Sequence, residues 1–246
     1  MGNSAESVKD ADPAPEKAPL WEDFVDIFYA PSSVFARRAE GKFGMPLLFL
    51  VIVGTILVFL TKNATQPIMD AEFARRSADM LRKNPNMTAE QLASGRGFFE
   101  TFGPLFFGIG MAVTVLLTGL VLWAVGKLFD AKESAAAAIM IAAYAEVPRI
   151  VQILTNAAQG LFMNPDSLTS MNSVGFSPAR FMNPDGSAVM IALLSRIDLF
   201  TIWVTILLAI GLHVVGKIPK QQAAIAAAIT WVVGALPAMF GAIRGG

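Results

Sequence analysis

Five long apolar runs decide what this chain can fold into. They are Gly44–Leu60, Pro104–Gly126, Ala135–Phe162, Ile197–Gly216 and Ala223–Phe240. A helix needs roughly 20 residues to cross a bilayer core about 30 Å thick, and each run reaches or approaches that length. The sequence therefore predicts an all-α, polytopic membrane protein. We expect a bundle of five transmembrane helices over residues 44–246, preceded by an N-terminal interfacial amphipathic helix.

Composition supports this class and excludes several others. The chain is 54% hydrophobic and 15% charged, whereas a soluble domain has about 25% charged residues. Its net charge of zero gives no attraction to nucleic acid. It has no cysteine and one histidine, His213, so neither disulfides nor a Cys/His metal site is expected. No Ser/His/Asp set and no phosphate-binding glycine loop occurs, so we expect neither an enzyme nor a cofactor.

The chain ahead of the first apolar run divides into two parts. Residues 1–19 are polar and rich in Ala, Pro and charged types, which predicts a disordered tail. Residues 20–43 have aromatic side chains at helical spacing but too many charges to cross lipid, which favours an amphipathic helix at the membrane surface. The candidate interfacial anchors are Trp21, Phe24, Phe28, Tyr29 and Phe35.

Two of the connections between the apolar runs are long. In Thr61–Gly103, the segment Ile68–Lys83 has an amphipathic pattern, and Thr88 with Gln91 has the spacing of a capping box. Met163–Arg196 contains the tripeptide Asn-Pro-Asp twice, at 164–166 and 183–185. This tripeptide favours a tight turn, although a calcium or ligand loop is an alternative. Whether the two connections pack together as a cap stays open.

Lysine and arginine positions indicate the orientation. The two short connections, 127–134 and 217–222, carry two lysines each close to the apolar runs, and further basic residues precede the first run. Basic residues in short loops favour the cytoplasm. We expect a multi-pass protein of the bacterial inner membrane, with a cytoplasmic N-terminus and an extracytoplasmic C-terminus.

Ionisable residues inside the apolar runs are the candidate sites. Glu146 and Arg149 lie three positions apart and share a helix face, and Pro148 between them predicts a kink. Such residues are functional candidates because each is costly in lipid unless it is paired or wet. A structural pair facing the bundle interior is the alternative. Arg196 and Asp198 open the fourth run, where Asp complements the helix dipole and Arg reaches the headgroups.

Small residues are frequent in the spans. They cluster at the start of the third run and throughout the fifth, where Gly234 and Ala238 form a small-xxx-small pattern. Such faces let membrane helices approach closely. They indicate a compact bundle, or a face for another membrane protein or a second copy of the chain.

Three stretches resemble one known family, the YIP family of membrane proteins that interact with Ypt/Rab GTPases, and particularly its prokaryotic members. They are Phe24–Arg38, Ala142–Ile153 and Ile197–Trp231. The resemblance implies five spans with the N-terminus in the cytoplasm and the C-terminus outside it. It supplies an architecture, because the prokaryotic members have no settled activity.

Three functions follow as hypotheses. The first is a non-enzymatic scaffold or adaptor that associates with other membrane proteins or with itself. The second is a small transporter or channel component that uses Glu146 and Arg149 at the Pro148 kink. The third is a membrane-shaping protein that inserts its N-terminal amphipathic helix into the bilayer as a wedge.

Overall fold

The computed structural model describes residues 19–84 and 86–245, and within them the chain forms helices without any β-strand. Residues 1–18 of the predicted tail lie outside this part. The helices are α1 (Leu20–Asp26), α2 (Pro31–Arg37), α3 (Gly44–Lys83), α4 (Ala89–Lys127), α5 (Ala135–Ala145), α6 (Pro148–Phe162), α7 (Ala188–Arg196), α8 (Leu199–Gly216) and α9 (Lys220–Gly245). Three 3-10 turns, η1 (Pro165–Ser167), η2 (Met171–Val174) and η3 (Pro178–Phe181), lie between α6 and α7.

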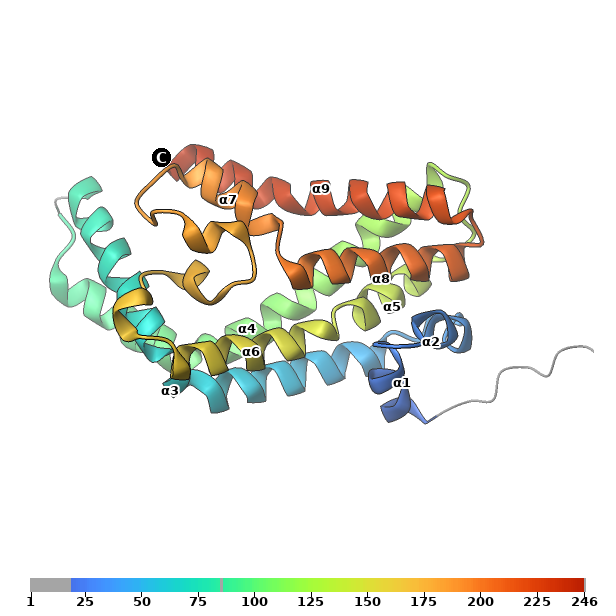
Figure 1. Ribbon diagram of the computed structural model, residues 1–246, viewed down its shortest axis with the longest axis horizontal. Helices are drawn as coiled ribbons and strands as arrows, with labels where there is room; N and C mark the ends of the chain where they lie inside the picture. Colours follow the sequence, from blue (N-terminus) through green and yellow to red (C-terminus); the bar gives the residue numbers. More distant parts are fainter. Residues whose placement is uncertain (1–18, 85, 246) are drawn as a thin grey trace, which may run out of the picture.

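Five helical stretches are long and apolar enough to cross a membrane. They are Gly44–Lys83, Glu90–Lys127, Ala135–Phe162, Leu199–Gly216 and Lys220–Arg244. These stretches run side by side along the long axis of the molecule (Figure 1). The predicted class, an all-α bundle with five membrane spans, is confirmed.

The first two spans are much longer than expected. The predicted amphipathic helix at Ile68–Lys83 is present, but it continues the first span without a break, because α3 runs to Lys83 and α4 already begins at Ala89. At 1.5 Å per residue, helices of 40 and 39 residues measure about 60 Å each, twice the thickness of the bilayer core. The polar residues after Leu60 end the apolar part of the span, but the helix continues through them.

The last part of α3 and the first part of α4 form a polar hairpin at one end of the bundle. The predicted capping box at its turn is confirmed, since Thr88 Oγ1 accepts from the Gln91 N–H at 3.2 Å and Gln91 Oε1 accepts from the Thr88 N–H at 3.0 Å. The outer part of α3, drawn in teal, turns away from the long axis of the bundle (Figure 1). This hairpin packs against the connection between α6 and α7.

Helix α5 lies at the centre of the bundle. Residues 137–145 are all buried, and α5 contacts α3, α4 and α8. Most of its alanines are buried, and glycines of the neighbouring helices let these helices approach it closely. A Cβ at Gly119 of α4 would lie 2.5 Å from Ile139 Cα, and one at Gly211 of α8 would lie 2.4 Å from the Ile141 side chain. These small residues therefore serve packing within the chain. By contrast, Gly234 and Ala238 of α9 are exposed.

The N-terminal helices are held against the bundle by a buried carboxylate. Asp23 of α1 is 0% exposed. Its Oδ1 accepts from Arg37 Nη2 at 2.8 Å, and its Oδ2 accepts from Arg38 Nε at 2.5 Å and from the Tyr144 hydroxyl at 3.2 Å. Asp26 pairs with Arg37 as well, at 2.6 Å. One acidic side chain thus joins α1, the end of α2 and the central helix α5.

We expect Asp23→Ala to destabilise the folded protein strongly. The change leaves two partly buried arginines without their shared partner, and breaking a buried pair costs about 3–5 kcal/mol. Thermal unfolding in mild detergent should show a markedly lower Tm than wild type. The matched control is Glu40→Ala, which removes the exposed ion pair with Lys42 and should cost about 0–1 kcal/mol. Equal Tm changes in the two variants would contradict this assignment.

Candidate functional site

The predicted ionisable pair lies at a break in the third span. Helix α5 ends at Ala145 and α6 begins at Pro148. Proline has no N–H to give to the Tyr144 carbonyl, and this carbonyl instead accepts from the Val147 N–H at 3.2 Å. Glu146 therefore lies in a tight turn between two helices. Counted from Ala135, it is about 17 Å along the helix axis, close to the middle of a bilayer core about 30 Å thick.

Four polar side chains form a chain of contacts from this turn toward the start of α8. Arg149 Nε donates to Glu146 Oε2 at 2.8 Å, and Arg149 Nη1 donates to Gln152 Oε1 at 2.9 Å. Gln152 Nε2 then donates to Asp198 Oδ1 at 3.3 Å. We call these residues, Glu146, Arg149, Gln152 and Asp198, the polar ladder. Their spacing of three residues on α6 keeps the first three on one helix face.

Asp198 is the end of the ladder and a structural junction. Its Oδ1 caps α8 by accepting from the N–H groups of Phe200 and Thr201, at 3.0 and 3.3 Å. Its Oδ2 accepts from the Phe176 N–H at 3.1 Å, which ties the α6–α7 connection to α8. The predicted role of Asp198 at a helix N-terminus agrees with this geometry. The contact with Gln152 had no signal in the sequence, because the two residues lie on different helices.

Arg196 lies within electrostatic reach of Glu146 and Arg149, but its hydrogen bonds go to α9. Its Nη2 donates to the Trp231 carbonyl at 2.9 Å, the Trp231 indole N–H donates back to the Arg196 carbonyl at 3.3 Å, and the guanidinium lies 5.6 Å from the Trp231 ring centroid. It therefore joins the end of α7 to α9 within the protein.

His213, the single histidine, contacts the Ile218 carbonyl through Nδ1 at 2.6 Å.

A groove of about 500 Å³ runs beside the ladder between α4 and the α5–α6 break. One wall comes from α4, with Phe107, Gly110, Met111, Thr114 and Val115. The other wall is polar and holds Glu146, Arg149, Gln152, Ile153 and Asn156. Both members of the ionisable pair line this groove, with 8% of the Glu146 side chain and 27% of the Arg149 side chain exposed.

Two details of the groove indicate what it could bind. Gly110 and Thr114 are exposed, one helical turn apart, and a Cβ at Gly110 would meet nothing within 4 Å. Opposite them, the buried Asn156 Oδ1 has no hydrogen-bond partner among the described residues. The α4 wall is thus open to close approach, while Asn156 on the α6 wall carries a buried acceptor that no described residue uses.

The predicted interfacial anchors divide into two groups. Trp21 and Tyr29 are 66% and 72% exposed, as an aromatic residue at a membrane surface would be. Phe24 stacks on Phe49 with ring centroids 3.7 Å apart, and Phe28 packs against Trp203. The prediction for Phe35 is wrong: it is 0% exposed and belongs to the protein core. The pull of Asp23 on Arg37 and Arg38 turns this face of α2 inward, which periodicity alone does not reveal.

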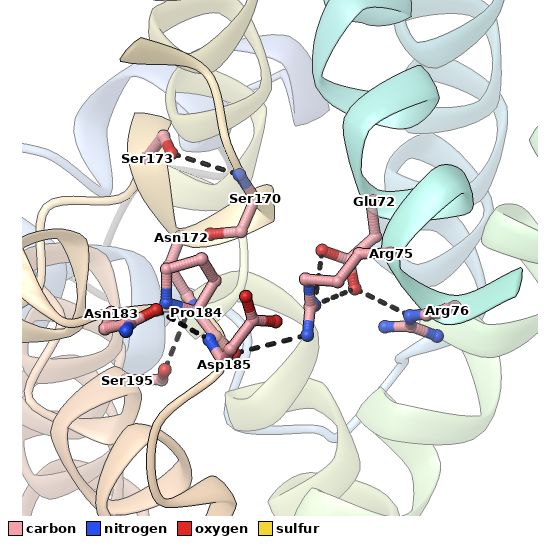
Figure 2. A network of polar contacts seen from close by, with 10 residues as sticks. All are labelled: Glu72, Arg75, Arg76, Ser170, Asn172, Ser173, Asn183, Pro184, Asp185 and Ser195. Carbon is pink, nitrogen blue, oxygen red and sulfur yellow. Dashed lines mark hydrogen bonds and ion pairs between the residues drawn. The ribbon is translucent and has the colours of Figure 1, made fainter. Parts of the chain in front are cut away.

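The outer part of α3 and the α6–α7 connection pack together as a cap. Arg75 of α3 binds both carboxylate oxygens of Glu72 at 2.8 Å and donates through Nη1 to the Pro184 carbonyl at 3.2 Å. Figure 2 shows Arg75 between Glu72 and the turn at Asn183–Asp185. Apolar contacts of Ile68 with Leu168 and Val174 reinforce this cap.

Both Asn-Pro-Asp segments form the predicted turns. Asn164 Oδ1 accepts from the Asp166 N–H and Asn183 Oδ1 from the Asp185 N–H, each at 3.0 Å. Within the described residues no group of three or more His, Cys, Asp or Glu side chains is placed to hold a metal ion.

Comparison with known proteins gives one match. The family model described as the Yip1 domain matches residues 25–241, which covers α2 to α9 and nearly all of the bundle described above. Neither the comparison with curated proteins nor that with solved structures found a match. On the strength of the family model, the chain belongs to the Yip1 domain family, and it is a multi-pass integral membrane protein.

Proposed function

We propose that the protein is a non-enzymatic membrane adaptor that holds a transmembrane helix of another membrane protein in the groove between α4 and α6. This proposal rests on one observation, which is that the two walls of the groove differ in chemistry. One wall has the open Gly110 and Thr114 positions, and the other has the ladder and the unpartnered Asn156 Oδ1.

The chemistry of helix association in lipid supports this occupant. Lipid supplies no hydrophobic drive between helices, so close backbone approach and interhelical hydrogen bonds stabilise the contact. A helix lying over Gly110 and Thr114 would approach closely there, and its side-chain donor could bind Asn156 Oδ1 once the Asn156 side chain turns toward the groove. The groove would thus select a helix with a polar donor, such as Ser, Thr, Asn or Gln, at one position.

The test is site-specific photocrosslinking in native membranes. A photoreactive residue at Thr114 should yield a discrete product whose partner peptide is a transmembrane segment. The same residue at Ile109, which is 52% exposed on α4 and outside the groove lining, should yield diffuse lipid adducts. Lipid adducts at both positions, or a bound small molecule in the groove, would overturn the proposal.

Two substitutions should weaken this association by different amounts. Gly110→Leu fills the groove and should reduce the crosslinked product about tenfold, equivalent to about 1.4 kcal/mol. Asn156→Leu removes one acceptor, worth about 0.6–2 kcal/mol, and should reduce it about 3- to 30-fold. Val113→Leu, on an exposed part of α4 outside the groove, is the control and should leave the yield unchanged.

Transport remains a second candidate because the charged pair lines an open groove. Purified protein in liposomes should then carry ions, and Glu146→Gln should reduce the flux, since it neutralises the carboxylate that faces the groove. Flux is measured with pH-sensitive and potential-sensitive dyes, and Glu100→Gln, outside the groove, serves as the control. Flux equal to that of protein-free liposomes would eliminate this candidate.

We also propose the orientation expected from the charges, with α1, α2 and the two short connections in the cytoplasm of a bacterium. The support is that Lys127, Lys132, Lys217 and Lys220 belong to connected segments at one end of the bundle. A reporter enzyme that is active only outside the cytoplasm should be active when fused to the C-terminus and inactive when inserted after Asp130. The reverse pattern would invert the assignment.

A further inference from the structure

Glu133 is a buried acidic side chain that the proposed adaptor role does not use. It lies in the connection between α4 and α5, near the end of the bundle where α8 turns into α9. It is 3% exposed, and among the described residues neither of its carboxyl oxygens has a hydrogen-bond partner. A carboxylate in such a place is costly, because an ion that leaves water needs a partner to offset its lost hydration.

Two glycines make the space in which this carboxyl lies. A Cβ added at Gly126 of α4 would come within 2.5 Å of Glu133 Oε1, and one added at Gly216 of α8 would come within 2.8 Å of Oε2. Leu212 and Ala131 form the rest of the wall. The carboxyl is thus wedged between two helix ends that approach closely because both lack a side chain.

The surrounding charges do not neutralise a carboxylate there. Lys127 of α4 acts on Glu133 electrostatically, but its ammonium group donates to the carbonyls of Ala131 and Glu133, at 2.7 and 2.6 Å. The other charged residues of these segments, Asp130 and Lys132 on the connection, Lys217 after α8 and Lys220 of α9, are exposed. Helix α5 begins with four alanines, and His213 of α8 contacts the Ile218 carbonyl. Burial raises the pKa of the Glu133 carboxyl above its ordinary value, against the smaller opposing effects of its own backbone and of Lys127.

The carboxyl lies where two connections are fastened together. The Lys132 N–H donates to the Gly216 carbonyl at 2.9 Å, joining the α4–α5 connection to the end of α8. Lys217, directly after Gly216, has the left-handed conformation, with φ at 55°, that turns the chain toward α9. Movement of Glu133 out of its space would therefore strain this hydrogen bond and release the seam between the two connections.

We propose that Glu133 is a proton-binding site that latches the α4–α5 connection to the α8–α9 turn. The neutral carboxyl fits the space between Gly126 and Gly216 and keeps the seam closed. Loss of the proton leaves an unpaired charge in that space, so the connection moves out to water and Lys132 separates from Gly216. The ligand of this site is a proton, and its binding reports the pH on that side of the membrane.

The direction of the pH dependence follows from the direction of the pKa change. The Glu133 carboxyl has the raised pKa when the seam is closed and its ordinary pKa when the seam is open to water. Between these two pKa values, a closed molecule therefore holds more bound protons than an open one. Closure is therefore fully favoured below the ordinary pKa and is lost as the pH rises through the raised pKa. Within that window the opening constant increases by up to about tenfold per pH unit.

The test is hydrogen–deuterium exchange of the full chain in lipid nanodiscs, from pH 5 to pH 9. At each pH, the exchange rate of the wild-type peptide containing residues 131–134 is divided by the rate of the same peptide in Glu133→Gln. This ratio removes the intrinsic pH dependence of amide exchange. We expect a ratio near one at the lowest pH and a rise of up to about tenfold per pH unit above it. A peptide from the opposite end, residues 160–175, should give a constant ratio.

Two further variants keep the outcome decisive. Glu133→Met, an apolar side chain of similar length, replaces Glu133→Gln as the reference if the amide variant does not fold. Gly216→Ala should displace the carboxyl and give fast exchange at residues 131–134 even at pH 5. A ratio that stays constant across the pH range, or Gly216→Ala exchange equal to wild type at pH 5, would overturn the proposal.

Discussion

A bilayer offers no water to a polar group, and this constraint governs the whole arrangement. Two of the acidic side chains that enter the bundle find their partners within the protein. Asp23 is held by two arginines and Tyr144, and Glu146 is held by Arg149. These contacts set where the helices sit. The first fastens the N-terminal helices to α5, and the second connects, through Gln152 and Asp198, the third span to the fourth.

Pro148 creates the candidate site. Because its ring breaks the helix in mid-membrane, Glu146 and Arg149 lie beside a groove and not within a continuous helix surface. The central helix α5 is packed on all sides, whereas α6 leaves one polar face open toward α4. A bundle that buries nine consecutive residues of α5 can carry this opening without losing its core. A closely packed central helix and a groove that is open at one side of the bundle are both consistent with an adaptor.

The sequence predicts what depends on neighbours along the chain. The five spans follow from the length of the apolar runs, the Glu146–Arg149 contact from a spacing of three residues, and the turn at Asn183 from local chemistry. Contacts between helices have no such signal. Asp23 falls on the polar side of a periodic pattern, yet it is buried because Arg37, Arg38 and Tyr144 converge on it.

The remaining differences have equally physical causes. Hydropathy marks where a helix leaves lipid but not where it ends, so it does not reveal that the outer parts of α3 and α4 are continuous with the spans. The groove could not be predicted, since it depends on how α4 and α6 pack, and the glycines beside Glu133 lie far apart in sequence. Such sites require the fold, even when each residue in them is visible in the sequence.

The central claim is that the groove between α4 and α6 is occupied by a helix of another protein. The most direct measurement is an electron cryo-microscopy map of the protein extracted with its surrounding native lipid. We expect helical density along Gly110 and Thr114, with a side chain reaching toward Asn156. A groove filled by lipid chains or solvent, with no helix beside α4, would contradict it.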